Sequence, residues 1–228
     1  MTIRLIATVI IAASSIATVA YARSSDAATA SNAHSVVGTS MAAGAIRFSV
    51  APTGNAARYR VREQLMGKDF PNDAIGETSQ ITGAIVVDST SGALVSAQSK
   101  FVVNTGALKS DSDRRDGYVR GRVLEVEKFP TVELVPTAFK GITAAAVNGA
   151  GPVTFDVIGN LTVRGVTRPT TWRVTARQAG GRVTGTAATK FTFADFSINP
   201  PRVPILLSVA DTIALEYDFT LTRDGVVR

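Results

Sequence analysis

The chain has 228 residues, with 24 Lys and Arg against 18 Asp and Glu, which gives a formal net charge of +6. This length fits one domain with terminal extensions and a full hydrophobic core. The absence of cysteine excludes disulfides, thiolate metal sites, thiol catalysis and lipidation at a cysteine. The basic residues are spread along the chain, a pattern that argues against a nucleic-acid-binding protein.

The N-terminus predicts a cleaved secretory signal peptide over residues 1–22. Arg4 precedes an apolar run that ends at Ala20-Tyr21-Ala22, an A-x-A cleavage pattern. An uncleaved anchor is the alternative, but the serine and threonine residues late in the run disfavour a spanning helix, which needs about 20 apolar residues. Cleavage would remove Arg4 and lower the net charge from +6 to +5.

Residues 23–44 are small and polar without sustained periodicity, which predicts a flexible leader before a folded domain over residues 45–225. The only histidine, His34, lies in this leader. We find no nucleophile–base pair and no metal-ligand spacing, so we predict no catalytic residue, no metal, no cofactor and a protein that is not an enzyme.

Alternation of apolar and polar residues predicts the secondary structure of the folded domain. Strands are expected over residues 45–50, 58–65, 81–88, 97–103, 131–139, 153–163, 171–177, 183–193 and 212–222. The polar stretch with Pro71, Asn72, Asp73 and Gly76 predicts a loop, and Ser110 or Ser112 is expected to cap a short helix over residues 110–120. Residues 199–204 contain three prolines and predict a loop or rim.

Residues 152–178 predict the central hairpin. Gly165 allows the positive φ of a tight turn. Pro169 lacks an N–H and should therefore lie near a strand start or on an unpaired edge. Pro136 likewise implies a bulge or an edge in its strand.

This pattern of about eight or nine strands with short connections predicts an all-β fold, namely an antiparallel eight-stranded barrel with one short helix. Closure of the barrel removes exposed strand edges. About eight strands leave room inside for one small or elongated ligand. Alternation alone does not show which face points inward.

Three stretches resemble the YceI-like lipid/polyisoprenoid-binding family of bacterial periplasmic proteins. They are LTVRGVTRPTTW at residues 161–172, KSDSDRRD at 109–116 and FPT at 129–131. The resemblance covers residues 45–223 and implies an extended lipocalin-like barrel in the periplasm that holds a polyisoprenoid or an isoprenoid quinone. The long leader and the proline-rich segment at 200–204 depart from the family pattern and leave the headgroup specificity open.

Burial of a long apolar chain in such a barrel would be favourable by about 25 cal/mol per Å², so we predict non-covalent lipid binding for carriage or storage. The side chains expected to line the tunnel are Phe101, Phe155, Leu161, Trp172, Val174, Phe191, Phe193, Leu215, Tyr217 and Phe219. The candidates for headgroup contact are Tyr59, Glu63, Arg114 and Arg115. Glu63, on the apolar phase of its strand, is alternatively one half of an internal salt bridge, and the arginines alternatively form solvated local ion pairs.

Three other kinds of protein fit the same sequence pattern. The same alternation is compatible with an eight-stranded outer-membrane barrel, with a structural or interaction protein whose core is filled, or with an enzyme that acts on the bound lipid. The expected partner is a long-chain isoprenoid lipid, with transient contact at a membrane surface and a homodimer as open options, and no nucleic acid.

Overall fold

The computed structural model describes residues 44–143 and 151–224 of the chain. The predicted signal peptide, residues 1–22, and all of the predicted leader except Gly44 lie outside the described residues. Both therefore stay predictions.

The described residues form ten strands, one α-helix and four single turns of other helix types. The strands are β1 Ala45–Val50, β2 Ala56–Leu65, β3 Asn72–Thr78, β4 Ile81–Asp88, β5 Lys100–Asn104, β6 Thr131–Lys140, β7 Pro152–Val163, β8 Val166–Ala179, β9 Arg182–Thr192 and β10 Leu206–Arg223. The helical pieces are η1 Ser96–Gln98, η2 Thr105–Ala107, α1 Asp113–Tyr118, η3 Val119–Val123 and η4 Ala194–Phe196.

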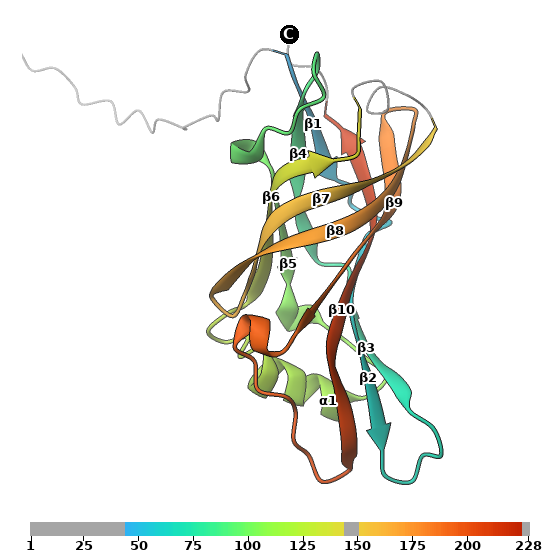
Figure 1. The fold of residues 1–228 in the computed structure, drawn as a ribbon, viewed down its shortest axis with the longest axis vertical. Helices are drawn as coiled ribbons and strands as arrows, with labels where there is room; N and C mark the ends of the chain where they lie inside the picture. The colour runs from blue at the N-terminus through green and yellow to red at the C-terminus, as the bar shows by residue number, and fades with distance from the viewer. Residues whose placement is uncertain (1–43, 144–150, 225–228) are drawn as a thin grey trace, which may run out of the picture. The chain divides into compact units, whose positions relative to one another are not determined.

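Eight strands form a closed antiparallel ring. The sheet runs in the order β1-β4-β5-β6-β7-β8-β9-β10, and β10 pairs back with β1. Figure 1 shows this barrel, with the β2–β3 hairpin continuing beside β10 below it. The predicted fold class, an all-β antiparallel eight-stranded barrel with one short helix, is confirmed for the described part of the chain.

β10 is the longest strand, and it joins the ring to the extra hairpin. Near its end Leu221 pairs with Val50 of β1, and further back Asp218 pairs with Ala56 of β2. β1 and β2 therefore pair with successive parts of the same edge of β10. The pairing of β1 with β10 closes the ring.

The predicted loop at residues 71–76 is wrong, because this stretch forms most of β3. Its acidic residues face the arginines of β2: Asp73 lies 3.2 Å from Arg60 and 3.1 Å from Arg62. The outer face of β3 is polar because its acidic residues form ion pairs with the neighbouring strand. Without that neighbour, a run of polar residues after Pro71 has the composition of a loop, and this is why the strand was not predicted.

The central hairpin follows its sequence prediction. Val163 of β7 pairs with Val166 of β8, and the two turn residues have positive φ, 49° at Arg164 and 75° at Gly165, as a two-residue hairpin requires. Pro169 pairs with Asn160 at a point before β8 begins to pair with β9, so its missing N–H costs no ladder hydrogen bond.

Two other predicted features, a bulge and a helix cap, are present. The β6–β7 register shifts between Pro136 and Ala138, which is the expected bulge. Ser112 caps α1, because its hydroxyl accepts the N–H of Arg115 at 3.4 Å.

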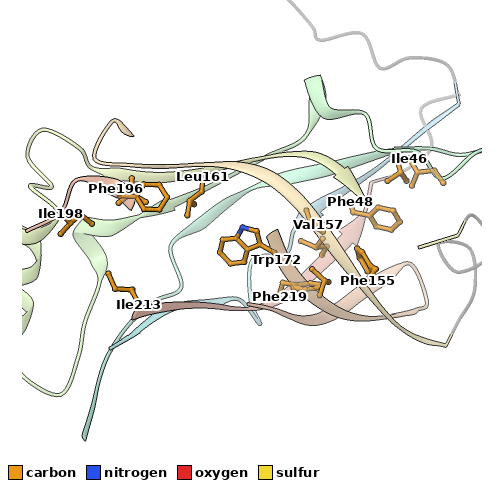
Figure 2. Packing of buried hydrophobic residues seen from close by; sticks show 14 of the residues in the cluster. Ile46, Phe48, Phe155, Val157, Leu161, Trp172, Phe196, Ile198, Ile213 and Phe219 are labelled. Carbon is orange, nitrogen blue, oxygen red and sulfur yellow. The ribbon is translucent and has the colours of Figure 1, made fainter. Parts of the chain in front are cut away.

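The apolar face of the ring points inward. Buried side chains from β1, β7, β8 and β10 form one cluster, in which Figure 2 shows Phe48, Val157, Trp172 and Phe219 facing one another. The outer face carries charged pairs such as Arg58 with Asp218 at 2.6 Å. The interior of the barrel is therefore the place to search for a site.

Candidate ligand cavity

A cavity of about 760 Å³ lies inside the barrel. Its walls are mostly apolar side chains from strands all around the ring, and residues of α1 and η3 line it as well. Sites for small molecules and cofactors have volumes of this order, about 300–1,000 Å³. The interior is therefore hollow, which contradicts the alternative of a filled core.

All ten side chains predicted to line a tunnel lie in the wall of this cavity: Phe101, Phe155, Leu161, Trp172, Val174, Phe191, Phe193, Leu215, Tyr217 and Phe219. They come from β5, β7, β8, β9, β10 and the residue before η4. Leu215 and Tyr217 remain partly exposed although they face inward, because the cavity leaves part of their surface uncovered. Contact of each residue with a ligand stays a prediction.

Aromatic rings meet edge to face along the wall. The rings of Phe101 and Tyr217 are 6.2 Å apart at 66°, and those of Phe139 and Phe155 are 5.6 Å apart at 82°. Such pairs are favourable arrangements of rings in an apolar interior. They also hold the rings in place without filling the space between opposite walls.

Trp172 presents only apolar surface to the cavity. Its indole Nε1–H donates to Thr170 Oγ1 at 3.0 Å, so the polar edge of the ring is satisfied by its own strand. The side chain is 6% exposed and lies centrally among the labelled residues of Figure 2.

Small residues on β9 provide part of the free volume. Ala187 lines the cavity, opposite Val174 and Tyr217 in the sheet. Gly185, two residues earlier, has no space for a side chain, because a Cβ there would lie 2.1 Å from Thr175 O and 2.7 Å from Phe219 Cζ. The glycine leaves room for the tip of the Phe219 ring beside β9.

The four predicted headgroup residues, Tyr59, Glu63, Arg114 and Arg115, also lie in the cavity wall. Arg115 of α1 is 2.9 Å from Glu63 of β2, and their side chains are only 18% and 11% exposed. Arg115 also pairs with Asp111, and Asn72 Nδ2 donates to Glu63 Oε1 at 3.4 Å. The internal salt bridge that the sequence left open as an alternative for Glu63 is therefore present.

Tyr59 and Tyr217 are two partly buried phenols of the wall. Burial is the largest cause that raises the pKa of Tyr59, to about 12, and the nearby guanidinium of Arg115 partly offsets it. Burial also raises the pKa of Tyr217, whose hydroxyl donates to Asn55 Oδ1 at 2.9 Å. Both phenols are neutral at physiological pH, as suits an apolar cavity.

Arg114 differs from Arg115, because it is exposed and has no ion-pair partner among the described residues. The wall also contains polar residues that the sequence did not predict, among them Tyr118 and Arg122. They follow Arg114 by four and eight residues, so their spacing places all three on one helical face. That spacing was the signal that would have found them.

Two further kinds of site were sought in residues 44–143 and 151–224. No group of three or more His, Asp or Glu side chains there is arranged to hold a metal ion. No helix in the same ranges is long and apolar enough to cross a membrane.

Comparison with known proteins finds relatives of this chain among the UPF0312 proteins. A UPF0312 protein of Pseudomonas putida (strain GB-1) is 32% identical over 106 residues, which are 43% of this chain and 51% of that protein. A UPF0312 protein of Yersinia pestis (strain Pestoides F) is 39% identical over 71 residues, 31% of this chain and 32% of that protein. The matched part thus spans about half of the first relative and a third of the second.

Solved structures share the fold at low sequence identity. A polyisoprenoid binding domain from Saccharophagus degradans superposes with a TM-score of 0.57 at 14% identity, covering 78% of this chain and 98% of that one. BcnA of Burkholderia cenocepacia gives 0.52 at 17% identity, covering 72% and 95%. The sequence profile of the YceI-like domain matches residues 29–221. Because that match covers most of the sequence, the chain belongs to the YceI-like domain family.

Proposed function

We propose that this protein binds a long-chain amphiphile of the polyisoprenoid or isoprenoid quinone type, without covalent attachment, in the cavity of its barrel. The observation that carries the proposal is the hollow interior of about 760 Å³ with almost wholly apolar walls. Water finds few hydrogen-bond partners in such a space, whereas an apolar chain is stabilised by about 25 cal/mol for each Å² of surface that it buries. The polyisoprenoid binding domain that shares this fold supports the same ligand class.

The headgroup would lie at the α1 end of the cavity, where the polar lining residues gather. Arg115 and Glu63 already satisfy each other, so they hold α1 against the barrel and offer little to a ligand. Arg114 and Arg122, which have no ion-pair partner among the described residues, are the cations available to a headgroup. This arrangement favours an anionic or hydrogen-bond-accepting group there.

The setting we propose is the periplasm, reached through cleavage of the signal peptide predicted over residues 1–22. The role we propose is carriage or storage of the lipid, with no catalytic step. The basis for a binding role is that the buried carboxylate of the cavity wall, Glu63, is held in an ion pair with Arg115, which also pairs with Asp111.

The direct test is to purify residues 23–228 from the periplasm without detergent, extract the protein with organic solvent and analyse the extract by mass spectrometry. A stoichiometric isoprenoid lipid is the expected result. An empty extract from folded protein that also fails to bind added polyprenols would refute the proposal and leave an interaction or structural role.

A matched pair of variants tests whether the cavity is the binding site. Ala187→Trp places an indole in the cavity, whereas Ala188→Trp places the same indole on the exposed outer face of β9. We expect the first variant to lose most of its bound lipid and the second to keep it, with both barrels folded by circular dichroism. Equal lipid content in the two variants would place the ligand elsewhere.

A further inference from the structure

Among the described residues, the large apolar side chains that are exposed gather at one end of the molecule. They are Met66 at 63%, Phe70 at 79%, Ile205 at 41% and Leu207 at 60% exposed. Met66 and Phe70 lie on the turn between β2 and β3, and Ile205 and Leu207 lie where β10 begins. Isolated exposed apolar residues need no explanation, but four on two adjoining turns mark a contact surface.

The two turns are physically joined. The N–H of Met66 donates to the carbonyl of Ile205 at 2.8 Å, and Leu65 pairs with Leu206 in the sheet. Figure 1 shows both turns at the lower end of the barrel, beside α1. We call the surface formed by residues 66–70 and 199–207 the apolar tip.

The apolar tip is continuous with the cavity wall. Ile205 lines the cavity and is at the same time exposed to solvent, and Leu65, Val203 and Leu206 line the cavity beside it. An apolar path therefore leads from the outside of the tip to the interior. A ligand that is insoluble in water needs such a path if it is to pass between a bilayer and the barrel without crossing water.

In the described part of the chain, cations without an ion-pair partner outnumber such acids at the tip and on the neighbouring helical segment. Lys68, Arg114, Arg122 and Arg202 have no ion-pair partner among the residues that the structure describes, against two such acids nearby, Asp69 and Asp113. The backbone N–H of Arg202 donates to Tyr118 Oη at 3.3 Å, which joins the tip to the helix that carries Arg114. Exposed apolar side chains accompanied by unpaired cations suit the interface of a bilayer with anionic lipids.

We propose that the apolar tip docks onto anionic lipid bilayers, with Phe70 and Leu207 entering the headgroup region and the cavity opening toward the membrane beside Ile205. A second copy of the chain is the less suitable occupant. Four side chains on two turns fall well short of the roughly 20–30 residues a side that stable protein interfaces use. Docking rests on the tip alone, so it does not depend on which lipid the cavity holds.

The test uses one tryptophan at the tip and one away from it. In Phe70→Trp the new indole lies at the tip, while Ala188→Trp serves as the matched control on the outer face of β9. The natural Trp172 is buried and provides the same background in both. With phosphatidylglycerol vesicles we expect a blue shift of emission in Phe70→Trp only, weaker with phosphatidylcholine vesicles and reduced by salt. The same response in both variants, or in neither, would overturn the proposal.

A loss-of-function variant gives a second measurement. Phe70→Ser with Leu207→Ser should weaken co-sedimentation with phosphatidylglycerol vesicles at least tenfold. Because neither residue lines the cavity, binding of geranylgeraniol, followed by Trp172 fluorescence, should be unchanged. Failure of the wild-type protein to bind geranylgeraniol would count against the proposed function, but it would not contradict docking of the tip onto bilayers.

Light scattering after gel filtration decides between the bilayer and a second copy. A monomeric wild-type protein that binds vesicles supports docking. A wild-type dimer that the double serine variant converts to a monomer, with no vesicle binding by either protein, would show that the tip serves self-association and would overturn the proposal.

Discussion

The guanidinium of Arg115 lies 2.9 Å from the carboxylate of Glu63, and this pair joins α1 to β2 at one end of the cavity. The two residues are 52 positions apart in the chain, so the pair closes a long loop. Both side chains are largely buried, and their charges depend on each other for stabilisation.

Removal of one partner should therefore be costly. In Glu63→Gln, the exposed Asp111 is the one ion-pair partner that Arg115 keeps among the described residues, and we expect the unfolding free energy, measured by urea denaturation, to fall by about 3 kcal/mol. Asp156→Asn, which breaks a pair with the exposed Arg173, is the matched control and should cost less than about 1 kcal/mol. Equal losses would show that the Glu63 pair is no more than a surface contact.

Gly185 predicts a steric limit on the cavity wall. In Gly185→Ala the new methyl group would overlap the backbone oxygen of Thr175 and the ring of Phe219, and a backbone atom yields less easily than the end of a flexible side chain. We expect a loss of about 2 kcal/mol in unfolding free energy. Gly117→Ala, where no atom lies within 4 Å of the added Cβ, should be neutral or stabilising because alanine favours the helix.

Asn55 lies between β1 and β2 and forms hydrogen bonds to both β10 and the residue that follows β1. Its Nδ2 donates to Ala51 O at 2.8 Å, and its Oδ1 accepts the Thr220 N–H at 3.1 Å and the Tyr217 hydroxyl at 2.9 Å. Asn55→Ala leaves these buried groups unpaired, so we expect a loss of about 3 kcal/mol by urea denaturation. The exposed Asn104→Ala should cost about 1 kcal/mol, and a larger effect there than at Asn55 would contradict the assignment.

Tyr59 predicts alkaline destabilisation. Burial raises its pKa to about 12, from about 10 in an unfolded chain, because the folded state disfavours the phenolate. The contribution of neutral Tyr59 is fully present below about pH 10 and is lost as the pH rises through 12. The urea midpoint of the wild type should drop between about pH 10 and 12.

Tyr59→Phe removes the group that titrates, so its urea midpoint should drop less over the same range. The raised pKa of Tyr217 acts in the same direction, so part of the drop should persist in this variant. An identical drop in both proteins would show that Tyr59 does not contribute.

Most individual elements could be predicted from local pattern. Period-two alternation located nine of the strands, and the Arg164-Gly165 turn located the central hairpin. Ser110 and Ser112 were both candidates for the cap of α1, and the structure selects Ser112. β3 was missed, because its acidic residues make sense only beside Arg58, Arg60 and Arg62 of the neighbouring strand. The cavity residues could be predicted as one alternating phase, since the division of side chains between two faces is a local property of each strand.

The sequence by itself determined that this chain forms antiparallel strands with one apolar face, because side-chain alternation depends only on neighbouring residues. Only the tertiary structure decided that this face surrounds a cavity, since that depends on ring closure between β1 and β10. It also decided the roles of the charged residues. Arg115 is neutralised by Glu63, and Arg114 beside it has no ion-pair partner in the described chain, because pairing depends on strands and helices brought together across long stretches of sequence.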